Sequence, residues 1–151
     1  MASVRRALAT DQDAVLVLMR GYCEEVGTPL SDEHLLDAIG PLIANEQLGD
    51  LLVAEQGEDL AGYLVITWGW GIESGGREAL IDEIYVAPSH RGLGLASALV
   101  EVSLEKAKTM NTKAVFLETE SDNPQSRELY ERLGFKAESS VWMRALLETD
   151  D

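Results

Sequence analysis

The sequence has very little cysteine and lysine, and it contains no long hydrophobic run. Cys23 is the one cysteine of the 151 residues, which excludes an internal disulfide. With no cluster of Cys and His, a structural zinc site is not expected either. A membrane-spanning helix needs about 18 or more apolar residues in succession, and none is present. The N-terminal stretch also lacks the apolar segment of a signal peptide. We therefore expect a cytoplasmic protein with no bound metal and no membrane contact.

Positive charge is scarce as well. The 27 acidic residues outnumber the 12 basic ones, so the formal net charge is −15. Nucleic acids are bound through a basic surface, and this balance argues against such a partner. The acidic excess has three explanations that the sequence leaves open: a solvated surface that keeps the chain soluble, steering of a cationic partner, or a salt-rich cytoplasm.

Apolar residues make up 46% of the sequence, an ordinary share for a folded domain. A chain of 151 residues is long enough to bury one sizeable core. We expect a single domain over residues 1–147, followed by a frayed acidic tail at residues 148–151. The composition is compatible with a homodimer, and the oligomeric state stays open.

Hydrophobic periodicity predicts a mixture of strands and helices. Thr10 with Asp13 fits a capping box, Ser31 fits an N-cap, and Gly134 fits the C′ position of a last helix. Early hairpins and a late strand-helix-strand crossover predict an α/β protein of the α+β type, with a mixed sheet and helices on both faces. Strands are expected at 3–8, 51–56, 60–70, 79–86 and 114–120, with one or two more inside 135–147, and helices between Thr10 and Pro29, after Ser31, at 92–109 and at 124–133.

The segment at residues 91–96, RGLGLA, joins a predicted strand to a predicted helix. A helix N-terminus offers unpaired N–H groups and a partial positive charge, which bind phosphate. Gly92, Gly94 and Ala96 are small enough for a ligand to approach the backbone, and Arg91 adds a cation with several donors. The Gly-Lys-Ser/Thr of a Walker loop and the third glycine of a dinucleotide fingerprint are both missing. Taken alone, these glycines could simply shape a turn.

The stretch VAPSHRGLGLASALVE resembles motif A of the GNAT superfamily, the acyl-CoA-dependent N-acyltransferases. Its Gln/Arg-x-x-Gly-x-Gly/Ala signature is matched by Arg91, Gly94 and Ala96. Farther along, DNPQSRELYERLGF resembles the second signature of that family, in which an Asn opens a helix that carries Leu-Tyr and ends in Gly-Phe. The resemblance is specific from about Leu80 to Phe135. It implies a mostly antiparallel sheet with one splayed pair of parallel strands, and acetyl-CoA as cosubstrate.

The resemblance also implies how acetyl-CoA is held. Its pyrophosphate would lie on backbone N–H groups of Arg91, Gly92, Leu93, Gly94, Leu95 and Ala96. Its pantetheine arm would run along the strand edge formed by Ile84, Tyr85 and Val86, and an N–H at or near Val86 would bind the thioester carbonyl. Asn123 and Ser126 would touch the arm. For Asn123, an N-cap ahead of Pro124 is the alternative.

Glu83 is the candidate general base. At neutral pH an amine is almost entirely protonated, so a base must take its proton. Alternation along the strand predicts that Ile81, Glu83 and Tyr85 share one face, and burial there would raise the pKa of Glu83 into a useful range. An ion pair with Arg77 is the structural alternative, and Asp82 is the second candidate for the base.

Tyr130 is the candidate general acid. A phenol keeps its proton at neutral pH and could donate it to the departing thiolate. The alternative is a core aromatic packed on neighbouring leucines. His34 and His90 have no partner by spacing, and Cys23 is expected to be a small core residue.

The acceptor is expected to enter beside the first two helices and the loop at residues 69–78. Aromatic and acidic side chains here favour a cationic amine, although the two tryptophans could instead fill the core or a dimer contact. The residues concerned are Trp68, Trp70, Glu24, Glu25 and Glu73. The sequence thus predicts acetyl transfer from acetyl-CoA to a primary amine of a small molecule or peptide. The rival hypotheses are a non-catalytic acyl-CoA-binding regulatory module and a small Rossmann-type redox protein.

Overall fold

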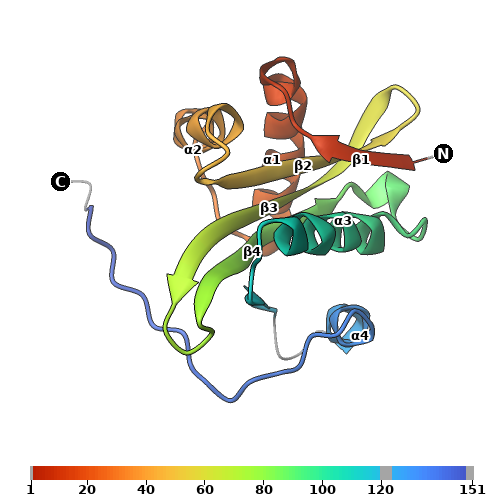
Figure 1. The fold of residues 1–151 in the computed structure, drawn as a ribbon. Helices are drawn as coiled ribbons and strands as arrows, with labels where there is room; N and C mark the ends of the chain where they lie inside the picture. The colour runs from red at the N-terminus through yellow and green to blue at the C-terminus, as the bar shows by residue number, and fades with distance from the viewer. Residues whose placement is uncertain (1, 120–123, 149–151) are drawn as a thin grey trace. The chain divides into compact units, whose positions relative to one another are not determined.

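A computed structural model describes residues 2–119 and 124–148 (Figure 1). The chain forms two compact units, Met1–Glu118 and Thr119–Asp151, and each is described by itself. The first unit holds the sheet and three α-helices, and the second holds the last helix. Within the described ranges, none of the helices has the length and hydrophobicity that a bilayer crossing requires.

The sheet of the first unit has five strands in the order β1-β2-β3-β4-β5. The first four pair antiparallel with their neighbours, whereas β4 and β5 run parallel. This mixed sheet confirms the predicted fold class. The strands are β1 (Ala2–Arg6), β2 (Gly49–Gln56), β3 (Asp59–Gly71), β4 (Gly76–Val86) and β5 (Ala114–Leu117).

Helices cover both faces of this sheet (Figure 1). Two of them, α1 (Gln12–Val26) and α2 (Asp32–Ala44), lie on one face, and α3 (Leu95–Thr109) lies on the other as the crossover between the parallel strands. The core between α1, α2 and the sheet is built from residues that alternate along the strands, such as Leu51, Val53, Tyr63, Val65 and Tyr85.

Two predicted helix ends are confirmed. The Ser31 hydroxyl accepts the His34 backbone N–H at 3.1 Å and so caps the start of α2. In the second unit, α4 (Pro124–Arg132) ends before Gly134, whose φ of 100° is left-handed. The Phe135 N–H then donates to the Tyr130 carbonyl at 3.0 Å, which satisfies one of the carbonyls that a helix end leaves free.

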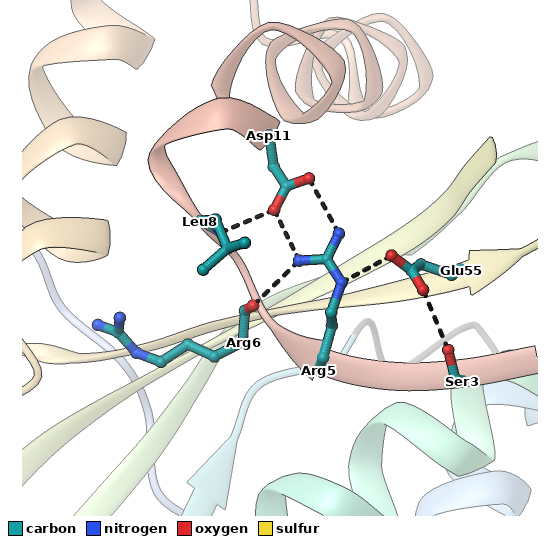
Figure 2. A network of polar contacts seen from close by, with 6 residues as sticks. All are labelled: Ser3, Arg5, Arg6, Leu8, Asp11 and Glu55. Atoms are coloured by element: carbon teal, nitrogen blue, oxygen red, sulfur yellow. Dashed lines mark hydrogen bonds and ion pairs between the residues drawn. The ribbon is translucent and has the colours of Figure 1, made fainter. Parts of the chain in front are cut away.

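The predicted capping box of Thr10 and Asp13 is wrong. A short 3₁₀ turn, η1 (Ala9–Asp11), precedes α1. Asp11 is the last residue of this turn and the N-cap residue of α1. The Asp11 carboxylate accepts the Leu8 N–H at 2.7 Å and two guanidinium N–H groups of Arg5 at 2.7 and 3.0 Å (Figure 2). Arg5 donates in addition to Glu55 on β2 at 2.6 Å. A tertiary contact to β1 therefore decides which acidic residue caps the turn.

Asp11→Ala should lower the free energy of unfolding by about 2 kcal/mol, because the Leu8 N–H and the Arg5 guanidinium both lose a partner. The hydrogen bond from Arg5 lowers the pKa of Asp11 below its ordinary value. The stabilisation is therefore present above the ordinary aspartate pKa and is lost as the pH falls through the lower folded-state pKa. Urea denaturation should show the difference from wild type at pH 7 and its disappearance in acid.

The matched control for that experiment is Asp13→Ala, which removes an exposed carboxylate from the first turn of α1. We expect it to change the free energy of unfolding by less than about 0.5 kcal/mol. Equal losses in the two variants would contradict the assignment of the cap to Asp11.

The predicted strands inside residues 135–147 are absent: residues 135–148 form neither helix nor strand. Trp142, Met143 and Leu147 are exposed there, the last to 94%. The apolar pattern of this segment fits a strand, but a strand exists only when a neighbouring strand pairs with its backbone. Sequence pattern alone does not supply that partner.

Candidate active site

Strand β4 carries a bulge in its middle, at Asp82. Glu83 lies opposite Val65 of β3, while Ile66, the next residue of β3, lies opposite Ile81. Asp82 is therefore an extra residue, and such an insertion interrupts the alternation of faces. Glu83 lies on the α1 face with Val65, and Ile81 lies on the α3 face with Ile66. The expectation that Ile81 shares a face with Glu83 is wrong for this reason.

The parallel pairing of β4 with β5 stops at the same place. Its register runs from Glu78 opposite Ala114 to Ile81 opposite Leu117. Beyond that point β4 continues through residues 82–86, and within the described ranges no strand pairs with it on the β5 side. The bulge and the end of the pairing together leave a stretch of strand edge open.

The backbone of that edge presents free donors. The Ala87 N–H donates to the Ala61 carbonyl of β3 at 2.8 Å. Because backbone groups alternate in direction along an antiparallel strand, those of Val86 and Ile84 point away from β3, toward the open edge, and those of Tyr85 point toward β3. The Val86 carbonyl on this edge accepts the Arg91 Nε–H, so an extended ligand can pair with the Val86 N–H and with the backbone of Ile84.

The loop before α3 follows this edge directly. After the short turn η2 (Pro88–His90), Gly92 and Gly94 adopt left-handed φ values of 83° and 80°. The helix begins at Leu95, which places its start after the glycines and not at Gly92 as predicted. An ideal Cβ built at either glycine would meet no atom within 4 Å. The glycines are thus needed for backbone conformation, and the space in front of them is open.

The N–H groups of this loop are largely unused. That of Arg91 donates to the Pro88 carbonyl at 3.4 Å, and the first intrahelical bond runs from Ala98 to Gly94 at 3.1 Å. For the N–H groups of residues 92–96, the described part of the chain provides no acceptor. Free N–H groups at a helix N-terminus, beside the open space at the two glycines, suit a pyrophosphate.

The side chain of Arg91 does not point freely into that space. Its Nε donates to the Val86 carbonyl at 2.9 Å, and a terminal nitrogen donates to Glu25 of α1 at 2.6 Å. Its guanidinium carbon lies 5.6 Å from the centre of the Tyr85 ring. In this structure Arg91 therefore ties the loop to α1 and to the end of β4.

Glu83 lies on the α1 face, half-buried, and the Tyr63 hydroxyl donates to its Oε1 at 2.7 Å. Burial raises the pKa of Glu83, the hydrogen bond from Tyr63 lowers it, and the charge of Asp82 raises it further, so the net direction is upward. Arg77 lies near the start of β4, opposite Trp70. The hydrogen bond to Glu83 thus comes from Tyr63, whereas the sequence suggested an ion pair with Arg77.

An aromatic cluster surrounds this carboxylate. The ring of Tyr85 lies 6.1 Å from that of Tyr63 and 6.1 Å from that of Tyr22, the latter edge-on. Burial raises the pKa of Tyr22, and the charges of Glu83, Asp82 and Glu118 raise it further. Burial likewise raises the pKa of Cys23, which is a buried core residue as expected.

The two tryptophans do not join Glu83. Strand alternation along β3 places Trp68 and Trp70 on the face opposite to Tyr63. Trp68 donates its indole N–H to the Glu46 carbonyl at 3.0 Å, and Trp70 is 74% exposed. Trp70 therefore does not fill the core, and neither ring lies on the α1 face with the carboxylate.

The second unit holds the candidate acid. Tyr130 is buried on α4, its ring 6.0 Å from that of Phe135 and nearly edge-on to it. Burial raises the pKa of its phenol, so it keeps its proton at neutral pH. Ser126 lies one turn earlier on the same helix face. Asn123 lies outside the described residues.

Sequence reasoning assigned no functional role to Tyr63, Tyr22 or Glu118. No local motif marks Tyr63, because its position beside Glu83 depends on the register of β3 against β4. That register shifts at the bulge between Val65 and Ile66, and a bulge is not marked by a local sequence pattern. Glu118 follows a strand whose end was predicted at residue 120, three residues beyond its actual end at Leu117.

The comparisons with known proteins identify this chain as an acyltransferase. Residues 15–135 match the model of the Acetyltransferase (GNAT) family, and the chain belongs to that family. This confirms the resemblance on which the sequence-based prediction was built.

Two curated relatives and one solved structure carry the comparison further. An uncharacterized N-acetyltransferase of Methanocaldococcus jannaschii is 35% identical over 86 residues, which are 55% of this chain but only 38% of that protein. An N-alpha-acetyltransferase of Sulfurisphaera tokodaii is 28% identical over 141 residues, covering 88% of this chain and 79% of the relative. The crystal structure of an integron cassette protein from the Cole Harbour Salt Marsh metagenome aligns with a TM-score of 0.87 and 26% identity, over 97% of this chain and 91% of that one.

Proposed function

We propose that this acyltransferase moves an acetyl group from acetyl-CoA to the primary amine of a small molecule or peptide by direct attack. The observation that carries the proposal is the open edge of β4, which offers the Ile84 and Val86 backbone next to the free N–H groups of residues 92–96. A pyrophosphate on those N–H groups and an extended pantetheine arm on that edge require no rearrangement of the loop. The half-buried Glu83 stands on the same stretch of strand.

Each step is assigned to a residue of this chain. Acetyl-CoA supplies the acetyl group as a thioester. The Val86 N–H donates to the carbonyl oxygen as negative charge develops on it. Glu83 takes the proton of the attacking ammonium, directly or through water. The neutral nitrogen attacks the carbonyl carbon, the C–S bond breaks, and Tyr130 gives its proton to the departing thiolate. The second proton that the nitrogen loses as the amide forms restores the phenol through solvent. The role of Tyr130 rests on the family signature around it.

The acceptor is a cation in this proposal. Asp82 and Glu83 are adjacent in β4, and Glu118 directly follows β5, which pairs with β4. A net charge of −15 also attracts a positively charged amine. The acidic surroundings favour the ammonium form of the acceptor on arrival, and Glu83 then takes its proton before attack.

Thiol release from acetyl-CoA across a panel of amines tests the function. The panel should hold monoamines, polyamines, peptide N-termini and aminoglycosides, with coenzyme binding measured in parallel by calorimetry. Turnover with at least one amine is the expected result. Tight coenzyme binding without thiol release for any amine would replace the proposal with the non-catalytic acyl-CoA-binding module.

Tyr130→Phe should lower kcat by roughly tenfold to a hundredfold while the Kd for acetyl-CoA stays within about twofold, because only the donated proton is lost. Steady-state kinetics and calorimetry on the same preparation measure the two quantities. Equal losses in kcat and in coenzyme affinity would instead make Tyr130 a binding or packing residue.

A further inference from the structure

Tyr63 is a buried residue with an unusual partner. Its side chain has 0% exposure, yet its hydroxyl donates to Glu83 Oε1 at 2.7 Å. The two residues lie on neighbouring strands. Tyr63 lies directly opposite Tyr85, and Glu83 lies two residues before Tyr85 in β4. The bulge at Asp82 is what brings Glu83 onto this face, so bulge and hydrogen bond together define where the carboxylate stands.

The Tyr63 ring is held on several sides. It contacts the ring of Tyr85 at 6.1 Å, and Tyr85 in turn contacts Tyr22 edge-on. Gly21 of α1 allows this arrangement, because a Cβ there would lie only 2.6 Å from the Tyr85 hydroxyl. A buried ring packed in this way has one position for its hydroxyl. Glu83, in contrast, is only half-buried.

This hydrogen bond opposes the other influences on Glu83. Burial and the charge of Asp82 favour its neutral form, whereas a donor to the carboxylate favours the ionised form. Tyr63 can only act as the donor, since burial and the adjacent carboxylate raise the pKa of its phenol far above the usual value. Of the two carboxylate oxygens, Oε1 accepts this bond, and the described residues offer Oε2 no donor. Oε2 is thus the oxygen that is free to accept a proton.

We propose that Tyr63 is a positioning residue for the transfer reaction: its hydroxyl fixes one oxygen of Glu83 and so aims the other at the acceptor amine, while keeping the carboxylate ionised. This inference rests on the proposed role of Glu83 as the base. Tyr63 itself touches neither the amine nor the coenzyme in this scheme, and it acts only through Glu83.

The test is Tyr63→Phe, which keeps the ring and its packing and removes only the hydroxyl. We expect kcat to fall by about tenfold, as for loss of a hydrogen bond to a charged group, with the Kd for acetyl-CoA unchanged. The acid limb of the kcat/KM profile should move to higher pH, because the ionised carboxylate loses its donor. The pKa of Glu83, measured by ¹³C NMR titration of its carboxyl in the absence of substrate, should also rise.

The matched control is Tyr22→Phe, which removes a hydroxyl from the same aromatic cluster but no hydrogen bond to Glu83. In this variant the pKa of Glu83 should equal that of the wild type. Thermal unfolding of both variants reports any loss of packing separately. A titration that moves equally in the two variants, or in neither, would overturn the role of Tyr63.

A double-mutant cycle separates this inference from the function on which it rests. If Tyr63 acts through Glu83, adding Tyr63→Phe to Glu83→Gln should cost almost no further activity. Full additivity of the two losses would overturn the inference while leaving Glu83 as the base. No change of the pH profile in Glu83→Gln alone would instead remove the base, and with it the role proposed for Tyr63.

Discussion

Glu83→Gln should lower kcat/KM by about a hundredfold to a thousandfold at neutral pH, the range expected when a general base is lost. In the wild type the rate should rise as Glu83 ionises and then level off. Because burial raises the pKa of Glu83, the rising part of the pH-rate profile should lie at a higher pH than the ordinary pKa range of a glutamate. Without the base, the rate follows the small fraction of neutral amine, so it should rise steeply with pH up to the amine pKa. A pH-rate profile from pH 5 to pH 10 measures both effects.

The control for this variant is Asp82→Asn, at the bulge next to Glu83. Asp82 is exposed on the strand, and its negative charge raises the pKa of Glu83. Its removal should therefore shift the acid limb slightly toward lower pH and cost little rate at neutral pH. A large loss in Asp82→Asn together with an unchanged profile in Glu83→Gln would assign the base to Asp82.

Gly94→Ala should raise the Kd for CoA by about a hundredfold, a loss of about 2.7 kcal/mol of binding free energy, because the pyrophosphate can no longer approach the loop backbone. Two effects act together: φ at this position is 80°, and the new Cβ would stand in the open space before α3. The free energy of unfolding should fall by only about 1 to 2 kcal/mol, the cost of a left-handed alanine. Calorimetric titration with CoA and urea denaturation measure the two quantities.

Gly57→Ala supplies the same backbone strain at a place without a ligand. Gly57 lies in the turn between β2 and β3, its φ is 66°, and a Cβ there would also meet nothing within 4 Å. We expect a similar loss of stability and no change in coenzyme affinity. If Gly94→Ala behaved like Gly57→Ala, the loop before α3 would be a turn and not a phosphate site.

Local signals predicted much of the fold. The N-cap at Ser31 and the stop at Gly134 each depend on a few neighbouring residues, and both have the predicted form. The glycine-bearing loop was also predicted, although α3 begins three residues later than expected. The mixed sheet also follows from the order of elements, because early hairpins give antiparallel pairs and the late crossover gives a parallel pair. Family membership was evident from the same loop and from the signature around Tyr130.

Long-range pairing accounts for what was missed. The cap at Asp11 depends on Arg5 of β1, and the strands expected inside residues 135–147 have no partner in the described structure. The bulge at Asp82 depends on how β3 and β4 align, and it alone moves Ile81 and Glu83 to opposite faces. Each of these features involves residues that are distant in the sequence or on different strands, and local patterns do not encode such contacts.

The sequence by itself determined the family, the loop before α3 and the residue types that acetyl transfer needs, because these depend on short motifs whose backbone conformation is set locally. Only the tertiary structure decided which way Glu83 faces, that Tyr63 donates to it, and that Arg91 binds Glu25 instead of pointing freely from the loop. The physical reason is that register, bulges and buried hydrogen bonds are fixed by packing between strands and helices, and that packing exists only once the chain has folded.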